Sequence, residues 1–301
     1  MDITLLTDAR YVNPSTIDWY IQNILDEDKL VLEALNKKGL TVTRTNWDNP
    51  EYDWTKTRFA VFRTTWDYFD RFPEFSQWLS SVNNKTNLIN SLSLVKWNMD
   101  KHYLRDLEDR GIHIPPTLFV EVGEIRSLSE IIKSTGWTDC ILKPAVSGAA
   151  RHTYKINAAN VKNHEAIFRK LIDEESMLIQ EFQHQIITKG EVALMVFGGK
   201  FSHAILKKAK AGDFRVQDDF GGSVHDYVPS QHEIDFAEHV VSSCSPKPVY
   251  ARVDVIWDNQ NRPCVSELEL IEPELWFRKN NRAAEMFADA VSNYIQLNTF
   301  D

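Results

Sequence analysis

The segment of residues 250–270 constrains the fold most, because apolar and charged residues alternate on both sides of a predicted turn. Alternate residues of a β-strand lie on the same face of its sheet. Residues 250–257 and 263–270 each follow this period of two, and the polar residues 258–261 between them are typical of a turn. The segment therefore predicts an antiparallel hairpin with one charged face and one apolar face.

The charged face of this hairpin carries a basic residue and three acidic ones, Arg252, Asp254, Glu267 and Glu269. With a turn near residues 259–260, the three carboxylates converge beside Arg252. Like charges repel unless cations neutralise them, and carboxylate oxygens suit Mg²⁺. We therefore favour a metal site. The alternative is a solvated acidic face, which is the simpler interpretation for any one of these residues. If the face is solvated, neutralising one charge should cost little stability.

The first third of the chain alternates expected strands with expected helices. This order predicts a parallel sheet, and ligands usually bind at the carboxyl ends of such strands. The expected strands are residues 3–6, 40–43, 59–62 and 86–89, and the expected helices are residues 28–38 and 75–82. The last third favours hairpins, since residues 191–197 and 200–207 flank Gly198-Gly199.

Two further segments could bind a nucleotide phosphate. Lys143 ends an expected strand and precedes the small residues of the segment Ser147-Gly148-Ala149-Ala150-Arg151. A lysine there can hold phosphate oxygens, and a loop of small residues lets backbone N–H groups approach them. Arg215, in the loop before Gly221-Gly222, could likewise face an anion. Taken alone, the first signal is weak, because a Ser-Gly loop is usually just a turn, and the alternative for the second is an exposed connection.

The strand that ends at Gln180-Glu181-Phe182 offers backbone groups and a side-chain amide to an adenine edge, and Glu191 follows close behind. A buried strand is the simpler interpretation of this segment by itself. On the substrate side, Arg63, Trp66 and Asp67 follow an expected strand. There Arg63 could hold a carboxylate and Asp67 an amine, or Trp66 could simply pack a domain interface.

Composition narrows the class of protein. The net charge of −9 disfavours nucleic acid as a partner. Three cysteines without a C-x-x-C pair favour a reducing compartment. No signal peptide and no apolar run of membrane-spanning length is recognised, which predicts a cytoplasmic protein without a membrane partner. The P-loop, G-x-G-x-x-G, G-x-S-x-G and H-E-x-x-H motifs are absent from the sequence.

Taken in order along the chain, these residues resemble the ATP-grasp superfamily of carboxylate–amine ligases, which includes the RimK-type ligases and glutathione synthetase. The residues that carry the resemblance are Lys101, Lys143, Gln180-Glu181-Phe182, Glu191, Arg252-x-Asp254 and Glu267-x-Glu269. Glu269 departs from the asparagine usual at its position. The segments 63–68, 97–101 and 267–273 are more similar to the cycloserine-synthetase-like branch.

The resemblance implies an α/β and α+β fold: an N-terminal α/β domain (1–98) and two ATP-gripping subdomains (99–182 and 183–301). It implies ATP and two Mg²⁺ ions as cofactors, with Mn²⁺ as a substitute. It also implies a role for each site residue. Lys101 and Lys143 would hold the phosphates, and the loop that closes over them would include Ser147, Gly148 and Arg151. Adenine would contact Gln180, Glu181 and Phe182, and ribose would contact Glu191. Asp254, Glu267 and Glu269 would hold the metals, and Arg252 and Arg215 would steady the reacting species.

The expected reaction follows from the same resemblance. A small carboxylate or ureido substrate, amino-acid-like, would be activated as its phosphate and attacked by an amine in ligation or cyclisation, with release of ADP and phosphate. A kinase-like phosphotransferase, a non-catalytic nucleotide-binding protein and a metal-dependent hydrolase are the alternatives. Small molecules are the expected partners, and a homodimer is compatible with the sequence.

Overall fold

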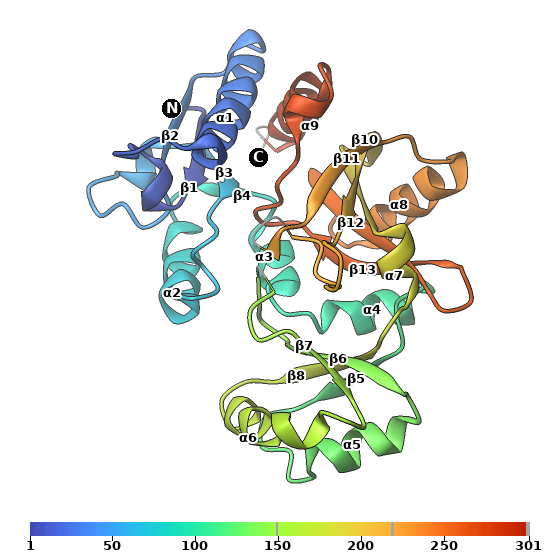
Figure 1. Cartoon of the computed structure of the whole chain (residues 1–301). Helices are drawn as coiled ribbons and strands as arrows, with labels where there is room; N and C mark the ends of the chain where they lie inside the picture. The colour runs from blue at the N-terminus through green and yellow to red at the C-terminus, as the bar shows by residue number, and fades with distance from the viewer. Residues whose placement is uncertain (149, 218–219, 299–301) are drawn as a thin grey trace.

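The N-terminal part is a parallel four-stranded sheet with helices between its strands (Figure 1). Its strands are β1 (Ile3–Thr7), β2 (Val42–Asn46), β3 (Phe59–Thr64) and β4 (Asn87–Ile89), in the order β2-β1-β3-β4. Helix α1 (Trp19–Lys37) connects β1 to β2, and helix α2 (Phe72–Val82) connects β3 to β4. The predicted parallel sheet is confirmed.

Helix α1 is longer than the pattern predicted. The Asp18 side chain accepts a hydrogen bond from the Ile21 backbone N–H at 2.8 Å, which caps the helix ten residues before the predicted start. The predicted start at residue 28 reflects the first apolar positions in helical spacing, whereas the cap that begins this helix is a polar contact. The extra turns place Glu27 inside the helix.

The computed structural model describes residues 1–148, 150–217 and 220–298, so Ala149 of the predicted phosphate loop lies outside the described residues. Its second sheet is antiparallel, in the order β5-β8-β6-β7. The strands are β5 (Thr117–Val120), β6 (Asp139–Pro144), β7 (Tyr154–Asn157) and β8 (Met177–Glu181). Helices α5 (Leu128–Thr135) and α6 (Val161–Ile172) pack together and share a core with this sheet.

The third sheet is antiparallel and has five strands in the order β11-β10-β9-β12-β13. The strands are β9 (Glu191–Phe197), β10 (Lys200–Lys208), β11 (Ser223–Tyr227), β12 (Tyr250–Trp257) and β13 (Pro263–Glu269). Both predicted hairpins are therefore present. Helix α8 (Gln231–Ser243) packs on β9, β10 and β12.

Short helices join these units. They are α3 (Leu92–Asn98), α4 (Tyr103–Asp109) and α7 (Gln185–Lys189), and the short 3₁₀ helix η4 (Phe277–Lys279) precedes α9. Helix α9 (Ala283–Leu297) is the last helix of the described residues and lies beside α1 (Figure 1). One hydrophobic core includes residues of the first sheet, the third sheet and α9. Each sheet falls inside one predicted domain, although α9 crosses back to the first, and the domain boundaries stay a prediction. No helix within the described ranges has the length and apolar character of a membrane span.

Candidate active site

The hairpin β12–β13 brings the three predicted metal-ligand carboxylates together. In its register Arg252 pairs with Glu269, and Asp254 pairs with Glu267. One carboxylate oxygen from each of the three acidic residues lies within 4.8 Å of the others. The donor set is all oxygen and carries up to three negative charges, which fits a hard divalent cation such as Mg²⁺. That these residues hold a metal stays a prediction.

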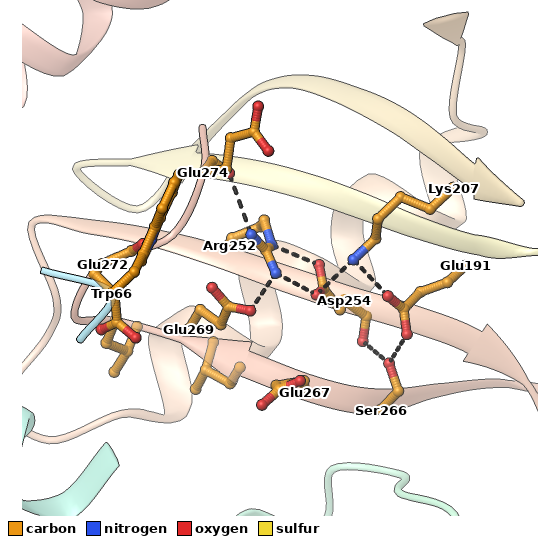
Figure 2. A network of polar contacts seen from close by, with 12 residues as sticks. Trp66, Glu191, Lys207, Arg252, Asp254, Ser266, Glu267, Glu269, Glu272 and Glu274 are labelled. Carbon is orange, nitrogen blue, oxygen red and sulfur yellow. Dashed lines mark hydrogen bonds and ion pairs between the residues drawn. The ribbon is translucent and has the colours of Figure 1, made fainter. Parts of the chain in front are cut away.

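Two cations lie against these carboxylates, as Figure 2 shows. Arg252 donates to both oxygens of Asp254, at 2.9 and 2.8 Å, and also to Glu269. Lys207, from β10, donates to Asp254 at 3.0 Å and lies 2.5 Å from Glu191. Burial opposes ionisation of Asp254, but the charges of Arg252 and Lys207 outweigh it and lower the pKa of Asp254.

Glu269 behaves differently from Asp254. Burial raises the pKa of Glu269 to about 7, and the attraction of Arg252 only partly offsets this effect. The negative charges of Asp254 and Glu267 add to the rise. A dication would relieve this repulsion, so the local charge balance is consistent with a cation site.

The charges of both predicted phosphate-binding lysines, Lys101 and Lys143, act on Glu267. Lys101 Nζ is 3.1 Å from the Glu267 carboxylate and also donates to the Ser147 carbonyl. Burial lowers the pKa of Lys143 to about 8, against the opposing attraction of Glu267. Lys143 makes no ion pair within 4 Å among the described residues, so its charge is available for an anion.

These side chains surround one cavity of about 210 Å³ between the second and third sheets, which we call the first cavity. Its walls include the carboxylate trio together with predicted nucleotide-site residues from both sheets. The predicted residues that line it are Lys101, Lys143, Ser147, Gly148, Gln180, Glu191, Arg215, Arg252, Asp254, Glu267 and Glu269.

Three residues predicted at the nucleotide site do not line the first cavity. Arg151 forms an ion pair with Glu175 at 2.6 Å. Phe182 is only 2% exposed, and the Lys155 ammonium lies 3.7 Å from the centre of its ring. The backbone N–H of Glu181 donates to Pro116. Their roles toward a nucleotide stay predictions.

A second cavity of about 440 Å³ adjoins the first, and Lys207, Arg252 and Glu269 line both. Its other walls carry mainly aromatic and acidic side chains, together with Arg10. They include Tyr11, Tyr20, Trp66, Phe69, Glu272, Glu274 and Trp276. The Trp66 indole N–H donates to the Glu272 carbonyl at 2.8 Å, which joins the first sheet to the segment after β13.

Glu272 and Asp70 are the acids of the second cavity that have no ion-pair partner among the described residues, and of the two only Asp70 is exposed. Glu269 lies against Arg252, and Glu274 accepts from Arg278 at 2.8 Å. In the part of the chain that the structure describes, no basic side chain lies within ion-pair distance of Glu272. Burial, and next the charge of Glu269, raise the pKa of the Glu272 carboxyl well above its usual range.

Two of the predicted substrate residues, Arg63 and Trp66, line one small cavity, whereas Asp67 lines neither that cavity nor the second cavity. Trp66 lines the second cavity. Arg63 is 2% exposed, with its Nε 3.3 Å from Asp28. Asp67 does not line the second cavity, because its carboxylate accepts from Arg71 at 2.7 Å and from the Trp47 indole at 2.8 Å.

Sequence reasoning missed Lys207, Glu272 and Trp276. A signal for Lys207 was present, because Lys207 and Glu191 have opposite charges and lie across the predicted hairpin, where they pair. Glu272 and Trp276 lie in an irregular segment without periodicity, where no spacing rule places a side chain.

The comparisons with known proteins agree with this geometry. Residues 3–90 match the family described as D-cycloserine synthetase DcsG, N-terminal domain. The chain is 26% identical over 288 residues to the cycloserine biosynthesis protein DcsG of Streptomyces lavendulae, an alignment that covers 88% of this chain and 93% of that protein. The crystal structure of D-cycloserine synthetase DcsG matches with a TM-score of 0.85 and 24% identity, covering 98% of this chain and all of the other.

The fold recurs in more distant ligases. A RimK domain ATP-grasp protein from Sphaerobacter thermophilus matches with a TM-score of 0.68 and 16% identity, over 96% of this chain and 99% of that chain. The chain has the ATP-grasp fold. A D-alanine–D-alanine ligase from Bacillus anthracis, solved with ATP, matches this chain with a TM-score of 0.64 and 14% identity, over 99% and 98% of the two chains. The predicted fold class, the resemblance to the cycloserine-synthetase-like branch and the class of ATP-dependent ligase are confirmed.

Proposed function

We propose that this ATP-grasp protein is an ADP-forming, Mg²⁺-dependent ligase that activates a small, amino-acid-like carboxylate or ureido substrate as its phosphate. An amine then attacks the activated carbon, in ligation or in cyclisation. The single observation that carries the proposal is the first cavity, where two lysines and three carboxylates surround a space that adjoins a second cavity. ATP-dependent carboxylate–amine ligation is the activity that the relatives support.

The first cavity is where we expect ATP. Lys143 and Lys101 would hold phosphate oxygens, and the Gln180 amide would contact the base. Asp254, Glu267 and Glu269 fit Mg²⁺ or Mn²⁺, which when bound would neutralise charge on the β- and γ-phosphates. The solved D-alanine–D-alanine ligase from Bacillus anthracis is complexed with ATP, which supports the choice of nucleotide.

The residues between the cavities are suited to the chemistry. A carboxylate or ureido oxygen is a poor leaving group, and phosphorylation converts it into a good one. Arg252 lies between both cavities and is held by Asp254 and Glu269, so it can stabilise the oxygens of the phosphorylated substrate. Lys207 lines both cavities as well and can hold the transferred phosphoryl group. Enclosure of the substrate would exclude water, which would otherwise hydrolyse the intermediate.

The second cavity favours a substrate that carries an amino group. Its aromatic walls can stabilise an ammonium by cation–π attraction, and Glu272 offers a carboxylate that no basic side chain in the described residues occupies. An amino-acid-like substrate would place its ammonium beside Glu272 and its reacting carbon toward Arg252. This placement is the support for the amino-acid preference.

A substrate screen tests the proposal. Purified protein with Mg²⁺ and ATP would be incubated with D- and L-amino acids, their ureido derivatives and matched carboxylates, and ADP release would be measured. We expect ADP and phosphate to appear only with the true substrate, and hydroxylamine to trap a hydroxamate when a carboxylate is activated. AMP and pyrophosphate as the direct products would contradict the proposal.

The alternatives predict different results in the same assay. A stable phosphorylated product without ligation or cyclisation would favour a kinase-like phosphotransferase. Nucleotide binding without substrate-dependent turnover would favour a non-catalytic nucleotide-binding protein. A cytoplasmic location and a homodimer stay predictions.

A further inference from the structure

Glu27 on helix α1 binds a segment that lies 250 residues later in the chain. Its carboxylate is buried, with 3% of the residue exposed. One oxygen accepts from the Phe277 backbone N–H at 2.8 Å, and the other accepts from the Arg278 backbone N–H at 3.0 Å. The Arg278 guanidinium also donates to it, at 2.9 Å. A helix of the N-terminal part therefore caps the short helix η4, which begins at Phe277.

The residue before η4 needs this support. Trp276 has φ +42° and ψ +47°, in the left-handed region that a bulky residue rarely adopts. Such a conformation persists only where surrounding contacts hold it. The two backbone N–H groups that follow Trp276 both donate to Glu27, and His203 Nε2 lies 2.9 and 3.1 Å from the carbonyl oxygens of Leu275 and Trp276.

The supported segment reaches the site. The Trp276 ring centre lies 5.3 Å from the Arg252 guanidinium, and Trp276 lines the second cavity. The Glu274 carbonyl accepts from Arg252 at 3.3 Å, as the dashed line in Figure 2 shows. Arg252 in turn donates to Asp254 and Glu269. One chain of contacts thus runs from helix α1 to the carboxylate trio.

We propose that Glu27 is a positioning residue for the ligase reaction. By holding the backbone turn at residues 276–278, it fixes the position of the Arg252 guanidinium and of the Trp276 side chain in the wall of the second cavity. This inference rests on the proposed function. Glu27 touches neither predicted nucleotide contacts nor metal ligands, so its influence should fall on the substrate of the second cavity and on the reacting group. Binding of ATP to the first cavity should change little.

The test compares Glu27→Gln with Glu33→Gln, which makes the same change on the same helix at an exposed side chain. The amide introduced by Glu27→Gln presents one acceptor oxygen where two N–H groups need acceptors, so one backbone bond of the turn is lost. Hydrogen–deuterium exchange of residues 274–280 should become at least about tenfold faster in Glu27→Gln, with residues 250–257 and 263–269 unchanged. Glu33→Gln should behave as the unaltered protein.

Kinetics separate positioning from a purely structural role. In the ADP-release assay, Glu27→Gln should raise KM for the substrate or lower kcat by about tenfold, with KM for ATP within about twofold. Glu27→Asp keeps the charge and both acceptor oxygens, so it should recover part of the loss, and it serves as the test if Glu27→Gln does not fold. Unchanged exchange at residues 277–278, or equal rises in both KM values, would overturn the inference. If no substrate gives ADP release with the unaltered protein, the proposed function fails, whereas the exchange measurement still decides whether Glu27 holds the turn.

Discussion

Single residues of the candidate site differ in how much they can be changed without loss of the fold. Asp254 is 1% exposed and pairs with Arg252 and Lys207, so the solvated face considered from the sequence does not apply to it. Asp254→Asn removes the carboxylate that the two buried cations share and leaves Arg252 with Glu269 and Lys207 with Glu191. Loss of this shared buried anion should cost about 3 kcal/mol of unfolding free energy. This corrects the expectation that neutralising one charge there costs little stability.

Glu267 offers the cleaner test of the metal assignment, because its side chain is 30% exposed. Glu267→Gln keeps the shape but removes a charged oxygen ligand, so turnover should fall by about a hundredfold or more, while the melting temperature changes little. Steady-state kinetics and a thermal melt measure both effects. Turnover near that of the unaltered protein would rule Glu267 out as a ligand. Raising the Mg²⁺ concentration should recover part of the activity if the loss is in metal affinity.

Lys143 predicts a pH dependence. Its pKa in the folded protein is about 8, below the usual 10.5, because burial disfavours the charge. The protonated form therefore destabilises the fold at low pH, and this penalty is relieved as the pH rises from 8 to 10.5. The change in the free energy of unfolding from pH 7 to pH 10 should thus be more favourable in the unaltered protein than in Lys143→Met, because all other titrating groups are the same in both. Urea titrations at the two pH values would show it.

The same lysine predicts proton uptake on nucleotide binding. Phosphate contacts favour the ammonium form, so ATP should bind with uptake of up to one proton between pH 8 and 9, and Lys143→Met should lose that uptake. Calorimetry in two buffers of different ionisation enthalpy measures this proton uptake.

Lys143→Ala should also weaken the binding of ATP more than the binding of adenosine. Loss of a charge-assisted contact should lower the affinity for ATP by roughly tenfold to a hundredfold. Equal weakening of the two ligands would make Lys143 structural.

At the scale of elements, the start of β9 depends on one glycine. Gly190 has φ +82°, and a Cβ built there would lie 2.3 Å from the Lys207 carbonyl oxygen. Gly190→Ala must push β9 and β10 apart beside the ion pair of Lys207 and Glu191. We therefore expect the free energy of unfolding to fall by roughly 2–4 kcal/mol and nucleotide binding to weaken. Gly199→Ala is the matched control, since Gly199 has φ +79° but no atom within 4 Å of the added carbon. The control should lose only about 1–2 kcal/mol.

At the scale of the whole molecule, the first cavity lies between two sheets, so a ligand there should stabilise the assembly of both. At a concentration of 100 times its Kd, a ligand adds about 2.7 kcal/mol to the free energy of unfolding. We expect MgATP to raise the melting temperature by a few degrees and ATP with a chelator to raise it less, because the carboxylate trio then repels the phosphates. Equal shifts with and without Mg²⁺ would argue against a metal at this site.

Much of the fold could be predicted from the sequence, because it depends on local patterns. The alternating β12–β13 hairpin, the Gly198-Gly199 turn and the parallel first sheet all follow from periodicity and turn chemistry, which depend on near neighbours. The second cavity could not be predicted from the sequence. Trp66 and Glu272 are 206 positions apart, and only the packing of the first sheet against the third joins them.

The alternation of side chains along a strand is enough to place Glu267 and Glu269 on the same face, because residues two apart in a strand share a face. Which face they share was decided by the tertiary structure. Near the turn Val255 pairs with Val265, and continuing that register would pair Asp254 with Ser266 and turn Glu267 away. A β-bulge at Ser266 shifts the pairing, so that Asp254 meets Glu267 instead.

Contacts outside the hairpin support this bulge. The Ser266 hydroxyl contacts the Asp254 carbonyl at 3.0 Å and the Glu191 carboxylate, on the neighbouring strand β9, at 2.8 Å. The residues of the hairpin therefore supply the three carboxylates, but their convergence depends on a one-residue shift in pairing. A shift of one residue reverses the face of every side chain beyond it. Spacing along the chain cannot predict that shift, because the partner that supports it lies on a strand about 75 positions earlier.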